Sequence, residues 1–181
     1  TLSLLDLDSG EASELFHDPR VDIDRAAVAE PDRVLYGVRY VPGSIAYHVL
    51  DDAKPYAAIL RAAIARFPDS SIEITSFTRN RDRALIHVVG DRNPGMFYEY
   101  EATNGTFTHL LTARRWLDPA RLAPVAPVSI TARDGQVLQG YLTRAAGSTG
   151  AGPLIVMPHG GPFGAKDAPL FDDIAQLFAQ Y

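Results

Sequence analysis

The most chemically suggestive residues of this 181-residue chain are His159, Gly160, Gly161 and Pro162, which follow the apolar run 153–157 (PLIVM) after one further proline. We expect that run to be a strand in the middle of a sheet covered on both faces, because it is apolar throughout. The two glycines let a bound group approach the backbone closely. Backbone N–H groups placed there could stabilise the negatively charged oxygen of an acyl-transfer intermediate. The sequence therefore predicts an oxyanion-binding loop.

Elements on both sides would position this loop in an α/β arrangement. Upstream, the stretches 128–132 and 137–142 flank Arg133-Asp134-Gly135 and predict a hairpin. Downstream, apolar residues at helical spacing predict a helix over 171–181, with Asp167 as a possible N-cap. Strand, glycine-rich turn and helix in this order are typical of an α/β unit. The alternative is a tight strand-to-helix turn without a catalytic role.

Residues 1–113 show a different pattern, in which short strands are separated by turn residues. Apolar runs and alternation predict about eight strands, at 2–7, 12–16, 33–41, 44–50, 72–78, 83–89, 96–102 and 107–111. Asn104-Gly105, between the last two, is the strongest short hairpin signal. One helix is expected over 54–67, where the apolar residues fall on one face and Asp51 or Asp52 can cap the start.

The strand-rich part contains a weak internal repeat. Segments 5–16 and 100–111 resemble each other, and their turns at Ser9-Gly10 and Asn104-Gly105 are 95 residues apart. Two periods of about 47 residues would match the blades of a β-propeller, each of which is a four-stranded sheet. The alternative is that hairpins resemble one another because few residue types suit their turns.

A change of composition separates the two parts. Three prolines fall between residues 118 and 127, where no apolar period is visible, and such a stretch is typical of a linker. We therefore expect the C-terminal part of a propeller domain over 1–117, a linker over 118–127 and the N-terminal part of an α/β domain over 128–181. The expected fold class is mixed, with partial β-propeller blades followed by the first strands and helix of an α/β domain.

Residues 128–181 resemble the opening of the catalytic domain of the prolyl oligopeptidase family of serine peptidases, and most of all its acylaminoacyl-peptidase and bacterial dipeptidyl-aminopeptidase-like branch. The resemblance rests on TARDG at 131–135, GYL at 140–142 and HGGP at 159–162. WLDP at 116–119 is similar to the family's connection between domains. The resemblance implies a β-propeller followed by an α/β-hydrolase domain.

The same resemblance implies that His159, Gly160, Gly161 and Pro162 shape the oxyanion region of a peptidase. Prolyl oligopeptidase itself has a tyrosine at the position of His159, and the hydroxyl of that tyrosine is an oxyanion donor. His159 therefore either donates from its ring or only shapes the loop. The family's Ser-Asp-His triad lies further along the chain, and no G-x-S-x-G nucleophile motif occurs here. Ser148 lies in a small-residue stretch without that motif, and we do not expect it to be the nucleophile.

These observations predict an internal fragment of a serine peptidase that hydrolyses short peptides by acyl transfer, with its triad outside this chain and no activity of its own. The expected partners are short peptides, the remainder of the propeller and hydrolase domains, and other copies of the chain, because incomplete sheets leave unpaired edges. Two alternatives stay open. One is an esterase or lipase with the same loop, and the other is a non-catalytic β-rich binding module.

Composition argues against several other function classes. The absence of cysteine excludes disulfides, zinc-thiolate sites and cysteine nucleophiles. A net charge of -5 argues against a nucleic-acid-binding surface, and no apolar run has the length of a membrane span. Nothing at the N-terminus has the pattern of a signal peptide. We expect no cofactor, no metal and a cytoplasmic location, with the periplasm as the alternative.

The remaining polar residues are expected to be structural. Four histidines outside the HGGP turn occur singly and without metal-ligand spacing, namely His17, His48, His87 and His109. The acidic pairs at 51–52 and 172–173 are expected to stabilise helix starts. Arg114-Arg115 is expected to be a solvated pair near the linker.

Overall fold

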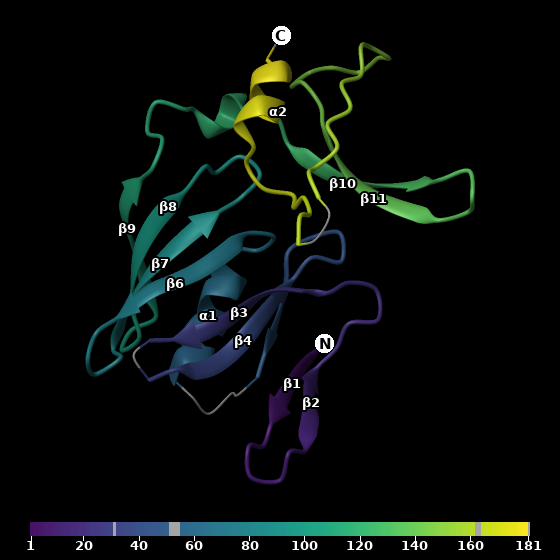
Figure 1. Ribbon diagram of the computed structural model, residues 1–181. Coiled ribbons are helices and arrows are strands. Elements are labelled where there is room, and N and C mark those ends of the chain that lie inside the picture. The colour runs from purple at the N-terminus through teal and green to yellow at the C-terminus, as the bar shows by residue number, and fades with distance from the viewer. Residues whose placement is uncertain (31, 51–54, 162–163, 181) are drawn as a thin grey trace.

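The computed structural model describes residues 1–30, 32–50, 55–161 and 164–180. Within these residues the chain forms four antiparallel sheets and few helices (Figure 1). No helix in the described part of the chain is both long enough and apolar enough to cross a membrane.

Two of the sheets are hairpins of two strands each. β1 (Leu2–Leu5) pairs with β2 (Ala12–Phe16), and β10 (Val125–Thr131) pairs with β11 (Val137–Thr143). Gly135 has a φ of +87° in the turn of the second hairpin, a conformation that favours glycine. The hairpin expected at 128–142 is therefore confirmed, and its first strand begins at Val125, inside the stretch predicted as a linker.

The other two sheets are larger. In the sequence, one precedes helix α1 and the other follows it. The first consists of β3 (Ile23–Ala29), β4 (Val34–Tyr40) and β5 (Ala46–Val49), and α1 (Pro55–Arg66) follows it. The second consists of β6 (Ser71–Phe77), β7 (Arg83–Val89), β8 (Met96–Glu101) and β9 (Thr106–Thr112). Each strand of the second sheet pairs with its neighbour in the chain, which is the arrangement within a propeller blade. The described residues form neither a closed propeller nor the core of an α/β-hydrolase.

The main hydrophobic core forms where α1 packs against these two sheets. Ile59, Leu60 and Ala63 lie on the inner face of the helix, at the spacing that the sequence predicts. They belong to one buried cluster with Ile86 and Val88 of β7. The helix predicted over 54–67 is thus confirmed as Pro55–Arg66, and its expected caps at 51–52 lie outside the described residues.

Polar contacts also join the two larger sheets. The backbone N–H of Ile72 donates to the hydroxyl of Tyr47 at 2.6 Å, and that hydroxyl donates to the carbonyl of Ser70 at 3.2 Å. Burial raises the pKa of Tyr47, so the hydroxyl keeps its proton at neutral pH. The guanidinium of Arg39 in β4 donates to the hydroxyl of Ser71 in β6. These bonds fix β5 and β4 against the start of β6.

The strand predictions for residues 1–113 are confirmed, with one strand missed. β3 (Ile23–Ala29) is IDRAAVA, whose alanines and charged residues give no clear period of two. It is a strand because it pairs with β4 along its length, and that partner is invisible to local propensity. The hairpin at Asn104-Gly105 is confirmed, with a φ of +69° at Gly105 and the side chain of Asn104 accepting from the N–H of Thr106 at 2.9 Å.

The strand predicted at 153–157 is wrong for the described structure. These residues form no strand, and Leu154 and Val156 are 73% and 76% exposed. A segment that is apolar on both faces becomes a strand when it has paired neighbours and covering layers. The described residues supply neither for this segment.

The helix predicted over 171–181 is confirmed in a shorter form, α2 (Asp173–Phe178). Its N-cap is Asp172, whose carboxylate accepts from the N–H of Ala175 at 2.7 Å, and the proposed cap at Asp167 is wrong. The expectation that the 172–173 pair stabilises a helix start is therefore confirmed. A short 3-10 helix, Pro119–Arg121, lies in the predicted linker.

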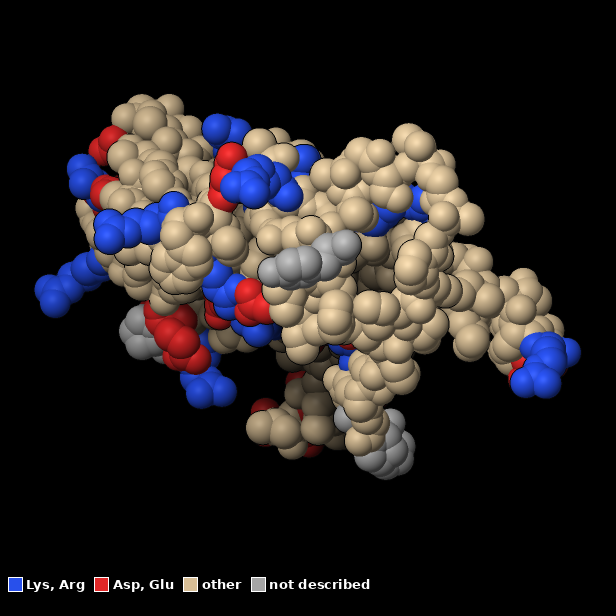
Figure 2. All heavy atoms as spheres, turned by 90° about the horizontal axis from the view of Figure 1, so that it is seen from above, with Lys and Arg blue, Asp and Glu red and all other residues tan. Residues whose placement is uncertain are grey.

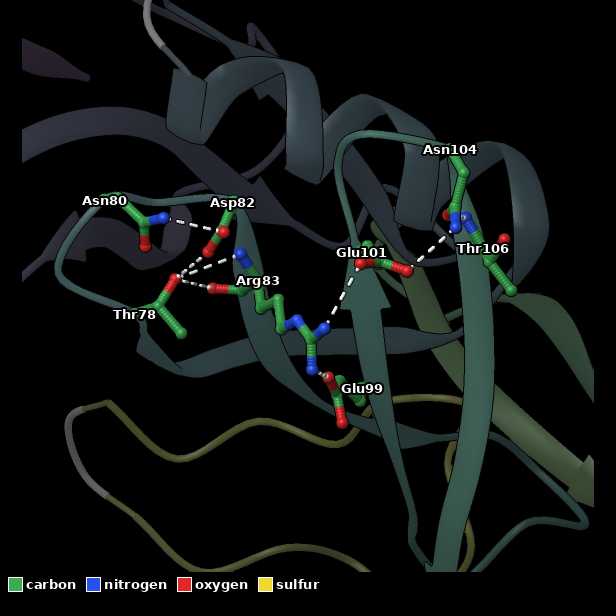
Figure 3. Close-up of polar contacts among 8 residues, drawn as sticks. All are labelled: Thr78, Asn80, Asp82, Arg83, Glu99, Glu101, Asn104 and Thr106. Carbon is green, nitrogen blue, oxygen red and sulfur yellow. Dashed lines mark hydrogen bonds and ion pairs between the residues drawn. The ribbon is translucent and has the colours of Figure 1, made fainter.

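Figure 3 shows how short polar contacts hold the β6–β7 turn and the β7–β8 ladder. The hydroxyl of Thr78 donates to the carboxylate of Asp82 at 2.6 Å, and the side-chain amide of Asn80 donates to the same carboxylate at 2.7 Å. Across the ladder, Arg83 pairs with Glu99 at 2.8 Å and with Glu101 at 3.3 Å. The two glutamates share one guanidinium on an exposed face, where each ion pair contributes little to stability.

The buried position of Ile86 gives a test of the core. Ile86 is fully buried, so Ile86→Ala should destabilise the protein by about 2–5 kcal/mol through lost burial and a cavity. Chemical denaturation measures the effect. Ile130→Ala is the matched control, because Ile130 is 58% exposed and its truncation should change stability by less than about 0.5 kcal/mol. Equal effects of the two variants would contradict the core described above.

The β6–β7 turn gives a test of local electrostatics. The hydrogen bond from Thr78 is the largest of the causes that lower the pKa of Asp82. A carboxylate with a lowered folded-state pKa stabilises the fold above its unfolded pKa, and the contribution is lost as pH falls through the folded pKa. Thr78→Val should therefore raise the pKa of Asp82 in a carbon-13 NMR titration of the carboxyls. Thr75→Val, which removes a hydroxyl bonded to the Leu85 carbonyl instead, should leave it unchanged.

Candidate functional site

The predicted oxyanion loop lies at the surface. His159, Gly160 and Gly161 are exposed, and Pro162 lies outside the described residues. A Cβ atom added at Gly160 or Gly161 would meet no atom within 4 Å, and neither residue has a left-handed φ. In this structure the two glycines thus leave open space beside the backbone rather than supply an unusual turn, and a ligand group could approach their N–H groups.

The ring of His159 makes one hydrogen bond, with the carbonyl of Gly160. The Nδ1 atom lies 2.6 Å from that oxygen. A carbonyl oxygen only accepts, so Nδ1 carries the proton in this contact. In the neutral tautomer with its proton on Nδ1, the Nε2 atom has a lone pair and no proton to donate. In this arrangement the ring orients the Gly160 peptide.

The segment after the loop is attached to both larger sheets. Lys166 Nζ lies 3.9 Å from a carboxylate oxygen of Asp24 in β3, and the same carboxylate pairs with Arg39 in β4 at 2.5 Å. The N–H of Phe171 donates to the carbonyl of Gly90, just after β7, at 2.8 Å. The loop therefore leads into a stretch of chain that the β-rich part holds in place.

Arg114 takes part in this attachment, which corrects the expectation that Arg114-Arg115 is simply solvated. The guanidinium of Arg114 pairs with the carboxylate of Asp173, at the first turn of α2, and lies 5.1 Å from the centre of the Phe171 ring. A cation over an aromatic face is favourable. Sequence reasoning missed this role because the partners lie more than fifty residues further along the chain.

A second contact missed at the sequence level lies at Gln176 in α2. The side chain is 3% exposed and its amide bonds to the backbone of Ala123 in both directions, at 2.8 Å and 2.7 Å. Nearby, the carboxylate of Asp91 accepts from the N–H of Val125 at 3.2 Å. The only local signal in the sequence is a polar residue among the apolar ones of a short helix.

The four other histidines lie against aromatic or hydroxyl groups. The expectation that they are buried or half-exposed holds for His87, whereas His17, His48 and His109 are exposed. His48 stacks on Phe16 and His87 on Phe97, with ring centres 4.7 Å and 4.4 Å apart. His109 lies 3.0 Å from the hydroxyl of Thr112, and His17 lies 3.0 Å from that of Thr1. Among the described residues, no three His, Cys, Asp or Glu side chains gather in a way that could hold a metal ion.

Ser148 lies in an exposed loop, where its N–H donates to the carbonyl of Ala145 at 3.1 Å. It is not at a strand-to-helix elbow, which is where a nucleophilic serine of the hydrolase type stands. A shallow depression of about 340 Å³ lies elsewhere, between the β7–β8 turn at 90–93 and the short 3-10 helix. Figure 2 shows Lys and Arg side chains interspersed with Asp and Glu on one face, rather than one continuous basic patch.

The Arg114 contacts give a test of how 171–178 is attached. Arg114→Met should weaken the attachment by about 1 kcal/mol, the sum of a partly exposed ion pair and a cation–π contact. Backbone amides of 171–178 should then exchange with deuterium about fivefold faster. Arg115→Met changes the neighbouring residue in the same way and should have no effect. Equal rates in the two variants would show that Arg114 does not hold this segment.

Comparison with known proteins supports a peptidase relation. No family model matches the chain. Dipeptidyl aminopeptidase BIII of Pseudoxanthomonas mexicana is 26% identical to it over 178 residues, which cover 92% of the chain and 25% of that enzyme. The chain thus spans about a quarter of the length of the curated relative that it matches. It is a distant relative of part of a peptidase.

Proposed function

We propose that this chain is part of a serine peptidase of the prolyl oligopeptidase family. In this proposal residues 1–117 contribute blades to a β-propeller, and residues 128–181 begin an α/β-hydrolase domain. The observation that carries the proposal is the similarity to a dipeptidyl aminopeptidase over 92% of the chain. The four-stranded sheet β6–β9, with its strands in chain order, supports the propeller assignment.

The proposed reaction is hydrolysis of short peptides by acyl transfer. A serine attacks the peptide carbonyl, a histidine takes the proton of the serine and passes it to the leaving amine, and an aspartate orients that histidine. All three groups lie outside this chain in the proposal. A propeller in front of such a site would restrict access, which favours short peptides as substrates. The proposal requires neither metal nor cofactor, and it places the enzyme in the cytoplasm, with the periplasm as the alternative.

The role proposed for residues 159–162 is stabilisation of the oxyanion by backbone donors. Gly160 and Gly161 are exposed, and a Cβ atom added at either would meet no atom within 4 Å, so a ligand has room to approach this backbone, which supports this role. The hydrogen bond from Nδ1 of His159 to the Gly160 carbonyl supports an orienting role for the ring. Removing one oxyanion donor from a hydrolase typically lowers kcat by about 10²–10³-fold. A His159 ring that donates to the oxyanion and a ring that only orients Gly160 therefore predict different losses of kcat on substitution.

Covalent labelling tests the proposal as a whole. The full-length protein that contains this chain should react with a fluorophosphonate probe and should release peptide fragments from short peptide substrates. Labelling together with hydrolysis of acyl esters but not of peptide amides would identify an esterase instead. A full-length protein that is neither labelled nor active would contradict the peptidase and favour a binding module.

Substitution of His159 tests how the loop acts. If the ring only orients Gly160, His159→Ala should lower kcat of the full-length enzyme by about tenfold or less, because the backbone donors remain. His159→Asn, whose side-chain N–H can bond the same carbonyl, should recover part of that loss. A loss of 10³-fold or more in both variants would mean that the ring is itself a donor. The matched control is His109→Ala, since His109 lies on β9 beside Thr112.

A further inference from the structure

The side chain of Gln176 is buried, and both the oxygen and the nitrogen of its amide form hydrogen bonds. Its Oε1 atom accepts from the N–H of Ala123 at 2.8 Å, and its Nε2 atom donates to the carbonyl of Ala123 at 2.7 Å. The same nitrogen lies 3.5 Å from the carbonyl of Asp91. The amide thus bonds Ala123 in the way that a neighbouring backbone peptide would. A buried amide of this kind is costly unless it is hydrogen-bonded.

This contact joins three stretches of chain that are far apart in the sequence. We call the contacts among Gly90, Asp91, Ala123, Phe171 and Gln176 the junction. Besides the bonds of Gln176, the junction contains the hydrogen bond from the N–H of Phe171 to the carbonyl of Gly90. It joins the end of β7, the predicted linker and α2. In Figure 1, α2 lies beside the short helix that precedes β10.

The junction lies where it can set the position of the loop at 159–161. From Gly161 the chain runs through Lys166, which lies near Asp24 of β3, and reaches the junction at Phe171. Among the described residues, the hydrogen bond between His159 and the Gly160 carbonyl is the one that involves residues 159–161. The position of the loop relative to the β-rich part therefore depends on where the segment after it is held.

We propose that Gln176 is a positioning residue for the oxyanion loop, because its buried amide fixes α2 and the segment 164–171 against the β-rich part and so sets the place of the 159–161 backbone. The proposal rests on the proposed function. Gln176 itself contacts no substrate and takes no part in proton transfer. Oxyanion donors act only when they are held where the charge develops.

Kinetics of the full-length enzyme test the proposal through Gln176→Met, which keeps the approximate size of the side chain and loses its hydrogen bonds to Ala123 and Asp91. Rates are expressed per serine labelled by a fluorophosphonate, so that loss of folded enzyme does not count. We expect kcat to fall about tenfold and KM to change less than about twofold, because the lost interaction acts in the transition state. The control is Gln180→Met, an exposed glutamine on the same short stretch. Values of kcat equal to wild type in Gln176→Met would overturn the proposal.

A second variant covers the case in which Gln176→Met does not fold. In Gln176→Glu the protonated carboxyl still donates to Ala123, whereas the carboxylate faces the carbonyls of Ala123 and Asp91. The ratio of variant to wild-type kcat should therefore fall by about tenfold between roughly pH 5.5 and 8. A ratio of one at every pH would contradict the proposal.

Hydrogen exchange separates failure of this proposal from failure of the proposed function. The hydrogen-bonded backbone amides of Phe171, Ala175 and Gln176 should exchange faster in either Gln176 variant than in Gln180→Met. Faster exchange in a protein that shows no peptidase activity would support the positioning role and sink the peptidase assignment. Unchanged exchange in an active peptidase would contradict the positioning role and support the peptidase assignment.

Discussion

The packing of α1 against two antiparallel sheets is the constraint on which the rest of the structure depends. Leu60 comes so close to β4 that a Cβ atom at Gly37 would lie 2.9 Å from its side chain and 3.1 Å from the carbonyl of His48. A larger residue at position 37 would require the Leu60 side chain and the His48 carbonyl to shift, so glycine favours this close approach of strand and helix. Ile59 and Leu60 thereby reach the cluster that contains Ile86. Hydrophobic burial thus fixes the three-stranded sheet, the helix and the four-stranded sheet as one unit.

Residues 128–181 are held by another kind of interaction. Their apolar side chains, such as Leu154 and Val156, lie largely in solvent, and the contacts that attach them to the β-rich part are polar. Arg114 binds Asp173, and the amide of Gln176 binds the backbone of Ala123. Polar contacts contribute about 1 kcal/mol each and specify geometry more than they add stability. The segment that follows the candidate loop is therefore attached by directed polar contacts rather than by a core of its own.

The contrast explains what the sequence could predict. Alternation and turn chemistry are local, so the strands around Asn104-Gly105 and the helix at Pro55–Arg66 follow from the residues themselves. β3 (Ile23–Ala29) and the segment 153–157 do not, because one is a strand through its partner and the other lacks partners. The HGGP turn could be found from its residues. The contact between its histidine ring and the Gly160 carbonyl, and the contacts made by Gln176, depend on distances that no sequence pattern contains.

Residues 159–161 are proposed to form the oxyanion wall of a serine peptidase. A crystal structure of the full-length protein after reaction with a fluorophosphonate tests this proposal most directly, because the phosphonyl oxygen occupies the place of the oxyanion. The account predicts that this oxygen lies about 2.7–3.1 Å from a backbone nitrogen of Gly160 or Gly161, while His159 remains bonded to the Gly160 carbonyl. A phosphonyl oxygen bound by other donors, with residues 159–161 remote from it, would contradict the account.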